Sequence, residues 1–271
     1  MKTTSPTPHR DVNVILNLLH SNVKEILQDQ FVGMYLFGSL ANGDFDQHSD
    51  IDVLVVTRDE ITNDIFSSLQ TMHTRIAGID SPWATQLEVS YIPHKALRRF
   101  DPANIRHPHM DRGRGESLHM LAHESDWIVQ RYILRERGII LEGPAPLSLI
   151  DPISSNDLRQ AVMDVLPLWA KPILDDPSQL KGRGYQSYVV LSLCRMLYTL
   201  QCGTIISKRA AAQWAQETLS TQWPHLIARA WLGRQNPGLE AEPEDVDGTL
   251  NFIRYIMDAS RKIEDSKYEM H

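Results

Sequence analysis

The chain has 271 residues, of which 42% are hydrophobic and 23% charged, a composition that supports one large globular domain or two modest ones. Its 27 basic and 34 acidic side chains give a net charge of −7, which argues against nucleic acid as the main ligand and is compatible with a cationic one. No apolar run approaches the roughly eighteen residues of a membrane span, and the N-terminal residues do not resemble a secretory signal. We therefore expect a cytoplasmic protein in which Cys194 and Cys202 are reduced thiols.

The first half of the chain alternates helical and strand patterns, which is typical of a mixed sheet with flanking helices. The predicted helices are 10–29, 60–78 and 125–137. The predicted strands are 34–37, 51–56, 87–92 and a possible fourth at 116–122. A domain with this pattern is expected to cover residues 1–150.

The second half, residues 151–271, is predicted to be an all-helical bundle, so the fold class is α+β. Three prolines followed by Ser-Ser-Asn within 143–156 mark the boundary. Ser155 or Asn156 can cap the first helix, Gly203 ends the second, and Ser207 can cap the third. The predicted helices run from 156 to about 170, then over 185–202, 208–219, 224–233 and 245–265.

The most informative stretch is LFGSLANGDFDQHSDIDVLVV, from Leu36 to Val56. A second strand in this stretch presents Asp50 and Asp52, and residues i and i+2 of a strand point to the same face. Two neighbouring carboxylates repel each other unless a cation lies between them. Hard oxygen ligands on one face suit Mg²⁺, so the pattern predicts a magnesium site.

A phosphate site is predicted beside the two aspartates. Gly38 allows the backbone to approach a phosphate closely, and Ser39 and Ser49 carry hydroxyl groups that can donate hydrogen bonds to it. Glu88 lies on the predicted strand 87–92. If that strand neighbours the strand of Asp52, Glu88 faces the same ions and can deprotonate an acceptor hydroxyl group. The combination favours nucleotidyl transfer over an ordinary loop that happens to contain two aspartates.

At these residues the chain resembles the nucleotidyltransferase superfamily, which includes DNA polymerase β and the aminoglycoside nucleotidyltransferases. The superfamily pattern of Gly-Ser, a spacer and Asp-x-Asp is complete at Gly38, Ser39, Asp50 and Asp52. The sequence VVLSLCRMLYTLQCGTIISKRAAAQWA, beginning at Val189, is similar to the C-terminal domain of the streptomycin 3''- and spectinomycin 9-adenylyltransferases. The resemblance extends from about residue 32 to residue 234.

The resemblance implies the division of labour between the two domains. The domain 1–150 would be the nucleotidyltransferase catalytic domain, and the helical domain 151–271 would contribute to nucleotide and acceptor binding. In the catalytic domain, Asp50 and Asp52 would bind metal, and Glu88 would be a metal ligand and the catalytic base.

The helical domain would supply residues to the nucleotide. By the same resemblance, Arg195 and Lys208 match basic residues that hold the triphosphate, and Trp231 falls where the family keeps an aromatic ring against adenine. The implied cofactor is Mg²⁺, as two ions, and the implied co-substrate is ATP. Its AMP moiety would pass to a hydroxyl group of the acceptor, with release of pyrophosphate.

The expected acceptor is a small cationic antibiotic of the spectinomycin or streptomycin class, and neither a nucleic acid nor a membrane is an expected partner. Family members that act on streptomycin carry acidic residues shortly before the position of Val189, whereas here LKGRGYQSY is basic and aromatic. This difference disfavours streptomycin and leaves a lincosamide, a metabolite or a protein side chain as alternatives. A non-catalytic nucleotide-binding or antitoxin-like module is a further alternative, against which the complete set of acidic and basic residues argues.

A histidine-rich segment, RHPHMDRGRGESLHMLAHESDW, is a separate feature. Its histidines are His107, His109, His119 and His123. Their spacing is tolerable for a transition-metal site, but three arginines crowd the same stretch. We expect instead that they line the acceptor pocket or a loop over it, with solvent-facing loop residues as the alternative. Carboxylates for a cationic acceptor are offered by Glu116, Glu124 and Asp126, and Trp127 lies near the position of the family's substrate-stacking tryptophan.

Overall fold

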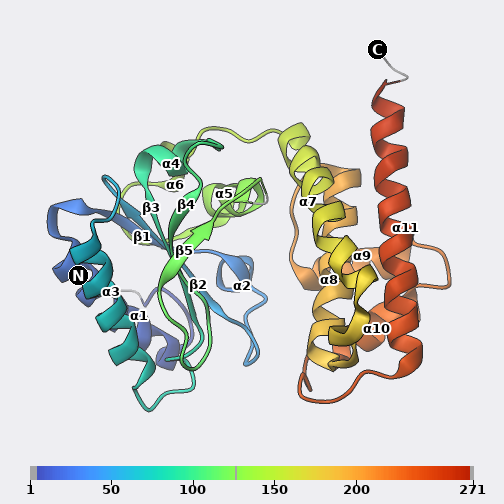
Figure 1. The fold of residues 1–271 in the computed structure, drawn as a ribbon, viewed down its shortest axis with the longest axis horizontal. Helices are drawn as coiled ribbons and strands as arrows, with labels where there is room; N and C mark the ends of the chain where they lie inside the picture. The colour runs from blue at the N-terminus through green and yellow to red at the C-terminus, as the bar shows by residue number, and fades with distance from the viewer. Residues whose placement is uncertain (1–4, 126, 269–271) are drawn as a thin grey trace. The chain divides into compact units, whose positions relative to one another are not determined.

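The structure, a computed structural model, describes residues 5–125 and 127–268. The chain divides into two compact units, Met1–Pro152 and Ile153–His271, which we call the N-terminal unit and the helical unit (Figure 1). The first unit contains a sheet with flanking helices and the second contains helices α7 to α11, so the expected α+β class is confirmed. Within the described residues, none of the helices is both long enough and apolar enough to cross a membrane.

A six-stranded mixed sheet forms the centre of the N-terminal unit, in the order β5-β4-β3-β2-β1-β6. The strands are β1 (Phe31–Leu36), β2 (Ile51–Thr57), β3 (Leu87–Pro93), β4 (Arg106–Met110), β5 (His119–Ala122) and β6 (Ile139–Glu142). Strands β2 and β3 run parallel, and the other described neighbours pair antiparallel. Parallel strands need a long crossover, and helix α3 (Asn63–Ala77) supplies it between β2 and β3.

Helices α1 (Arg10–Leu27) and α3 cover one face of this sheet (Figure 1). Alternate residues of the central strands point into the apolar core beneath these helices, as Val53 and Val55 do on β2. The residues between them face the opposite side, where four shorter helices pack against one another. These helices are α2 (Gly38–Asn42), α4 (His94–Arg98), α5 (Trp127–Arg137) and α6 (Pro146–Leu149).

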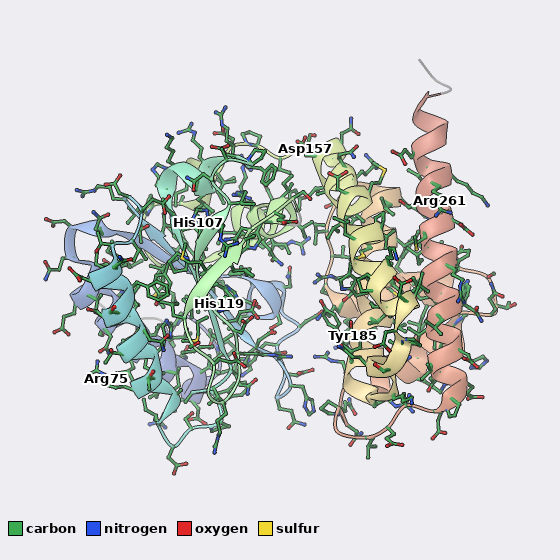
Figure 2. All side chains as sticks on the ribbon, in the orientation of Figure 1. Arg75, His107, His119, Asp157, Tyr185 and Arg261 are labelled. Atoms are coloured by element: carbon green, nitrogen blue, oxygen red, sulfur yellow. The ribbon has the colours of Figure 1, made fainter. Side chains whose placement is uncertain are left out.

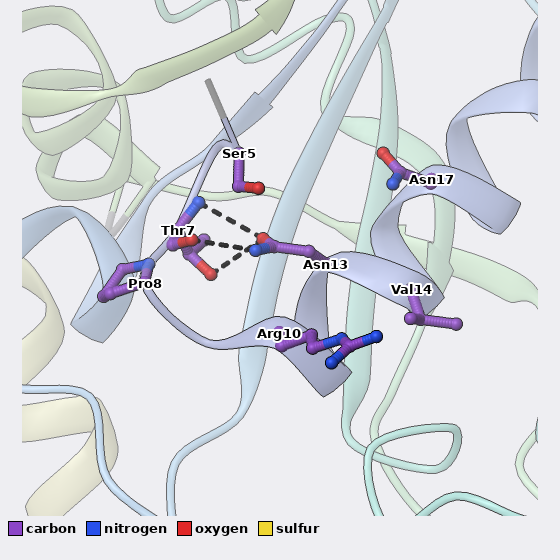
Figure 3. Close-up of a pocket in the computed structure, with 7 residues that line it drawn as sticks. All are labelled: Ser5, Thr7, Pro8, Arg10, Asn13, Val14 and Asn17. Atoms are coloured by element: carbon purple, nitrogen blue, oxygen red, sulfur yellow. Dashed lines mark hydrogen bonds between the residues drawn. The ribbon is translucent and has the colours of Figure 1, made fainter. Parts of the chain in front are cut away.

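The start of α1 is fixed by hydrogen bonds between Thr7 and Asn13 (Figure 3). The Thr7 hydroxyl donates to Asn13 Oδ1 at 2.8 Å, and Asn13 Nδ2 donates to the Thr7 carbonyl at 2.8 Å. The N-cap residue, His9, makes no side-chain cap of its own. These bonds therefore tie down the chain before the helix, beside a pocket that Thr7 and Asn13 help to line.

The helical unit is organised around α8, which packs against α7, α9, α10 and α11. The helices are α7 (Ser155–Asp175), α8 (Arg183–Cys202), α9 (Lys208–Thr218), α10 (Pro224–Gly233) and α11 (Pro243–Tyr268). Helix α8 buries residues on most of its surface because it has neighbours on several sides. The end of α8 at Gly203 and the cap of α9 by Ser207 are confirmed.

Several expectations about element boundaries were wrong. The N-cap of α7 is Ser154, and not Ser155 or Asn156. The Ser154 hydroxyl accepts a hydrogen bond from Asp157 N, and the Asp157 carboxylate accepts one from Ser154 N. The helix also continues through Pro167 and Pro172 to Asp175. The sequence did not predict β4 or β6, and the strand expected at 116–122 begins only at residue 119. Strand β4 has a polar sequence, RHPHM, which lacks a strand signal of its own.

A buried carboxylate links three segments of the helical unit. Asp245, at the start of α11, is fully buried and accepts hydrogen bonds from two guanidinium groups. Arg229 Nε donates to its Oδ1 at 2.6 Å, and Arg183 Nη1 donates to its Oδ2. Arg183 belongs to α8 and Arg229 to α10, so the Asp245 side chain connects three helices through ion pairs.

We predict that Asp245→Ala lowers the free energy of unfolding of the helical unit by about 3 kcal/mol, because Arg183 would keep a mostly buried charge without its counter-ion. The matched control is Glu244→Ala, which removes an exposed carboxylate 3.6 Å from Arg229 and should cost less than about 1 kcal/mol. Urea denaturation measures both. Equal losses in the two variants would contradict the assigned role of Asp245.

Candidate active site

Two carboxylates are brought together by the parallel pairing of β2 with β3. Asp52 and Glu88 are direct partners in the register of the two strands. The Ile51 and Val53 side chains on either side of Asp52 are fully buried in the core under α1 and α3, so the Asp52 side chain points to the opposite face. The adjacency that the sequence suggested for these two strands is confirmed.

Asp50 completes the group from the residue just before β2. One carboxylate oxygen each from Asp50, Asp52 and Glu88 lie within 4.8 Å of one another, and all three residues are partly exposed. We call these residues the acid triad. In the part of the chain that the structure describes, it is the group of His, Cys, Asp and Glu side chains whose spacing suits a metal ion. Three carboxylates this close are unfavourable without positive charge, and their hard oxygen atoms fit a divalent cation such as Mg²⁺.

Gly38 makes room for the Asp52 carboxylate. Its φ of +58° is a left-handed conformation, and a Cβ atom at this position would lie 1.7 Å from Asp52 Oδ2. The backbone next to it is tied to β2, because Phe37 N donates to the Asp52 carbonyl at 3.2 Å. A side chain at residue 38 would therefore displace the carboxylate, which explains the requirement for glycine.

The two candidate serines have different surroundings. The Ser39 Oγ atom is buried and has no hydrogen-bond partner among the described residues, as expected for a donor that is reserved for a ligand. Ser49 is buried, and its hydroxyl donates to Asp46 Oδ1 at 3.2 Å while accepting from Asp46 N at 3.0 Å. The Ser49 hydroxyl therefore stabilises the turn that leads into Asp50.

The remaining candidates lie in the helical unit and are described within it. Arg195 is on α8 and is partly buried. Lys208 is the first residue of α9, with its ammonium group 5.1 Å from the centre of the Tyr188 ring. Trp231 is on α10 and packs partly into the helical core, with the Arg234 guanidinium 4.9 Å from its ring centre.

Three of the four histidines in the histidine-rich segment are core residues of the N-terminal unit. His107, His109 and His123 are almost completely buried, and His119 is partly exposed. Figure 2 shows His107 on β4 and His119 on the neighbouring β5. The expectation of solvent-facing loop residues is thus wrong for the three buried histidines. Their positions also give no transition-metal cluster among the described residues.

Ser90 connects this histidine cluster to β3. The Ser90 hydroxyl lies 2.8 Å from His109 Nδ1 and 3.4 Å from His123 Nε2, and His109 Nε2 is 3.4 Å from Asp111 Oδ1. Donation from His109 Nε2 to the Asp111 carboxylate favours the tautomer in which Nδ1 accepts from Ser90. Because Ser90 follows Glu88 by two residues, the cluster adjoins the acid triad on the same face of the sheet.

The residues that the sequence suggested for acceptor binding differ in their exposure. Glu116 and Glu124 are exposed, and Asp126 lies outside the described residues. The Trp127 ring is buried, with its centre 4.0 Å from that of His123. It therefore packs within the N-terminal unit and does not offer an exposed stacking face.

Burial keeps the histidine cluster neutral. Loss of hydration lowers the pKa of His123 to about 3, with His107, His109 and Arg131 adding repulsion. Burial also lowers the pKa values of His107 and His109, although the carboxylates of Glu60 and Asp111 oppose the shift. Protonation at any of these rings would place a charge in the core.

We predict that the N-terminal unit loses stability as the pH falls below about 6.5. A histidine whose pKa is lower in the folded than in the unfolded state stabilises the fold fully above the unfolded pKa of about 6.5, and that stability declines at lower pH. For His123 the decline should approach about 1.4 kcal/mol per pH unit and end near a pH of about 3. Urea denaturation at several pH values measures it.

His123→Phe should flatten this pH dependence, and His225→Phe, at an exposed histidine, should leave it unchanged. A pH profile of His123→Phe that matches the unsubstituted protein would contradict the assignment.

We predict that Gly43→Ala lowers the free energy of unfolding by about 1 kcal/mol and Gly38→Ala by at least as much, because both glycines have a positive φ. A Cβ atom at Gly43 meets nothing within 4 Å, whereas at Gly38 it meets the Asp52 carboxylate. Only Gly38→Ala should therefore weaken binding of Mn²⁺, used as a probe for divalent cations. Equal Mn²⁺ affinities in the two variants would rule out the proposed link between Gly38 and the acid triad.

Comparisons with known proteins agree with this arrangement of units. Residues 20–96 match the nucleotidyltransferase domain family. Residues 148–258 match the C-terminal domain of aminoglycoside adenylyltransferases. The first match contains the acid triad, and the second contains Arg195, Lys208 and Trp231.

Similar proteins match along most of their length. A spectinomycin 9-adenylyltransferase of Staphylococcus aureus is 30% identical over 235 residues, which are 78% of this chain and 80% of the relative. An aminoglycoside (3'')(9) adenylyltransferase of Escherichia coli is 26% identical over 260 residues, covering 90% of this chain and 94% of the relative.

A solved structure shares the fold. The crystal structure of a spectinomycin adenyltransferase from Enterococcus faecialis with ATP and spectinomycin aligns with a TM-score of 0.70 at 19% identity, covering 92% of this chain and 98% of the other. With the acid triad, the two matched domains and a relative that is 30% identical over most of both chains, this chain belongs to the aminoglycoside adenylyltransferase family.

Proposed function

We propose that this protein transfers AMP from ATP to a hydroxyl group of an aminoglycoside-type antibiotic, with spectinomycin as the first candidate acceptor, and releases pyrophosphate. The observation that carries the proposal is the acid triad, which is held on two parallel strands next to Gly38 and Ser39. Family membership supports the adenylyl donor and the class of acceptor.

Asp50, Asp52 and Glu88 would hold Mg²⁺, as two ions. Their carboxylate oxygens fit this cation in number and chemistry, and the space that Gly38 leaves open admits the Asp52 carboxylate. When bound, the metal supplies positive charge that activates the acceptor hydroxyl group and stabilises the departing pyrophosphate. As its ligands, Asp50 and Asp52 would help to position the α-phosphate of ATP.

Glu88 acts as the general base. In this role a carboxylate oxygen of Glu88 accepts the proton of the acceptor hydroxyl group, and the resulting oxygen nucleophile attacks the α-phosphorus in line with the leaving group. The bond between the α-phosphorus and the bridging oxygen breaks, and pyrophosphate departs with that electron pair. Because Glu88 pairs with Asp52 across β2 and β3, the base would stand next to a residue that would hold the metal.

The turn at Gly38 and Ser39 binds the phosphate groups. The Ser39 hydroxyl is a buried donor with no hydrogen-bond partner among the described residues, so it would be available to a phosphate oxygen. Ser49 contributes indirectly, because its hydrogen bonds with Asp46 shape the turn before Asp50.

By family membership, residues of the helical unit would also bind the nucleotide. Arg195 and Lys208 would bind the triphosphate, for which guanidinium and ammonium groups are suitable partners. The Lys208 ammonium group also lies over the Tyr188 ring. Trp231 would offer its ring to the adenine base. Residues 1–150 would act as the catalytic domain, and residues 151–271 as the domain that completes nucleotide and acceptor binding.

The acceptor proposal favours spectinomycin over streptomycin. The segment before the middle of α8, from Pro177 to Cys194, contains no aspartate or glutamate. Streptomycin carries two guanidinium groups, whose recognition calls for carboxylates. In addition, the 30% identical relative from Staphylococcus aureus is named for spectinomycin alone.

We predict release of pyrophosphate from ATP and Mg²⁺ that depends on spectinomycin, when spectinomycin, streptomycin and a lincosamide are supplied separately. Glu88→Gln should lower the rate by about 100- to 10,000-fold, because the amide cannot accept the proton. Glu25→Gln, at an exposed position on α1, is the matched control and should keep full activity.

Each other outcome is informative. ATP binding without drug-dependent release would remove the antibiotic acceptor and favour a metabolite or protein acceptor. Release that persists in Glu88→Gln would exclude Glu88 as the base. Nucleotide binding with no release under any condition would favour a non-catalytic nucleotide-binding module.

A further inference from the structure

The turn between β4 and β5, residues 111–118, places an arginine at the acid triad. Arg112 Nη1 lies 3.4 Å from Asp50 Oδ2. The Arg112 side chain is 49% exposed and the Asp50 side chain 32%. The pair is therefore partly open to solvent, and its Asp50 member has one carboxylate oxygen within 4.8 Å of those of Asp52 and Glu88.

The backbone around Arg112 is held on both sides. On one side, the Asp111 carboxylate lies 3.4 Å from His109 Nε2 and 3.6 Å from His119 Nε2. On the other side, Gly113 N donates to the Thr85 carbonyl at 2.9 Å, in the segment that leads into β3. These contacts hold the backbone at Arg112 in place, whereas its long side chain can still change rotamer and contact a different partner.

A guanidinium group paired with one member of a cluster of three carboxylates has a clear electrostatic effect. It neutralises part of their negative charge, and it repels a divalent cation that approaches the same carboxylate. Guanidinium groups also bind phosphate oxygens strongly and with two parallel hydrogen bonds. Arg112 thus has two suitable partners within one site, the Asp50 carboxylate and the triphosphate of ATP.

We propose that Arg112 is a further substrate-binding residue that competes with the divalent cation for Asp50 and turns to the triphosphate when metal and nucleotide bind together. The metal and the triphosphate then arrive as a unit, since the metal alone must displace the guanidinium group from Asp50. This inference rests on the proposed function, because it takes the acid triad as the metal site.

The chain offers a matched control for long-range electrostatics. Arg114 is exposed on the same turn, two residues from Arg112. Arg112→Gln and Arg114→Gln change the net charge equally and at similar positions, so a difference between them reports the contact with Asp50. Arg112→Lys keeps the charge and removes the planar pair of donors.

The first experiment measures Mn²⁺ binding to the full-length protein without nucleotide, by electron paramagnetic resonance of free Mn²⁺. Relative to Arg114→Gln, Arg112→Gln should bind Mn²⁺ about two- to fivefold more tightly, which is the range for loss of an exposed ion pair. Equal or weaker affinity in Arg112→Gln would overturn the competition.

The second experiment measures ATP affinity in the presence of Mg²⁺. Arg112→Gln should weaken ATP binding by about tenfold relative to Arg114→Gln, and Arg112→Lys should recover only part of the loss. An unchanged ATP affinity would reject the transfer of Arg112 to the triphosphate.

Asp50→Asn separates this proposal from the proposed function. If that variant still bound Mn²⁺ with full affinity, the acid triad would not be the metal site, and both proposals would fail. If Asp50→Asn lost Mn²⁺ binding while Arg112→Gln matched Arg114→Gln in both experiments, only the role of Arg112 would fall.

Discussion

Mutual repulsion among Asp50, Asp52 and Glu88 is the constraint on which the site in the N-terminal unit depends. Three carboxylates within 4.8 Å of one another are tolerable only where the fold holds them rigidly and positive charge is close. Parallel pairing of β2 with β3 supplies the rigidity, since Asp52 and Glu88 are register partners whose neighbours on the strands are buried. Arg112 supplies one positive charge, and a divalent cation would supply more.

The face of the sheet that carries the acid triad is polar well beyond it. Ser90 follows Glu88 on β3, and its hydroxyl is hydrogen-bonded within the cluster of His107, His109 and His123. This cluster is buried and neutral, so its contribution to the stability of the N-terminal unit depends on pH. His109 of this cluster also contacts the carboxylate of Asp111, which precedes Arg112 at the start of the turn after β4. The turn after β4 therefore connects the buried histidine cluster to the ion pair between Arg112 and Asp50.

Much of this arrangement could be predicted from the sequence. The apolar runs of β2 and β3 identified the two central strands, and the period of two along a strand put Asp50 and Asp52 on one face. The helical unit followed from periodicity together with the cap at Ser207 and the stop at Gly203. Strand β4 could not be predicted, because RHPHM has no alternation of apolar and polar residues and pairs only because β3 and β5 lie on either side. Without this strand, the burial of the histidines in the core could not be predicted either.

The sequence alone determined which residues can carry the chemistry: a Gly-Ser turn, an Asp-x-Asp pair and a later glutamate on a strand. These are local patterns, and local patterns determine the type of element, the face on which a side chain lies and the type of turn. The tertiary structure decided which strands are neighbours, and therefore that Glu88 stands beside Asp52. It also decided that Asp52 occupies the space that a side chain at Gly38 would need, and that Arg112 reaches Asp50. Contacts between residues far apart in the sequence, such as Arg112 and Asp50, depend on sheet order and on burial across the whole unit, and no window of sequence contains either.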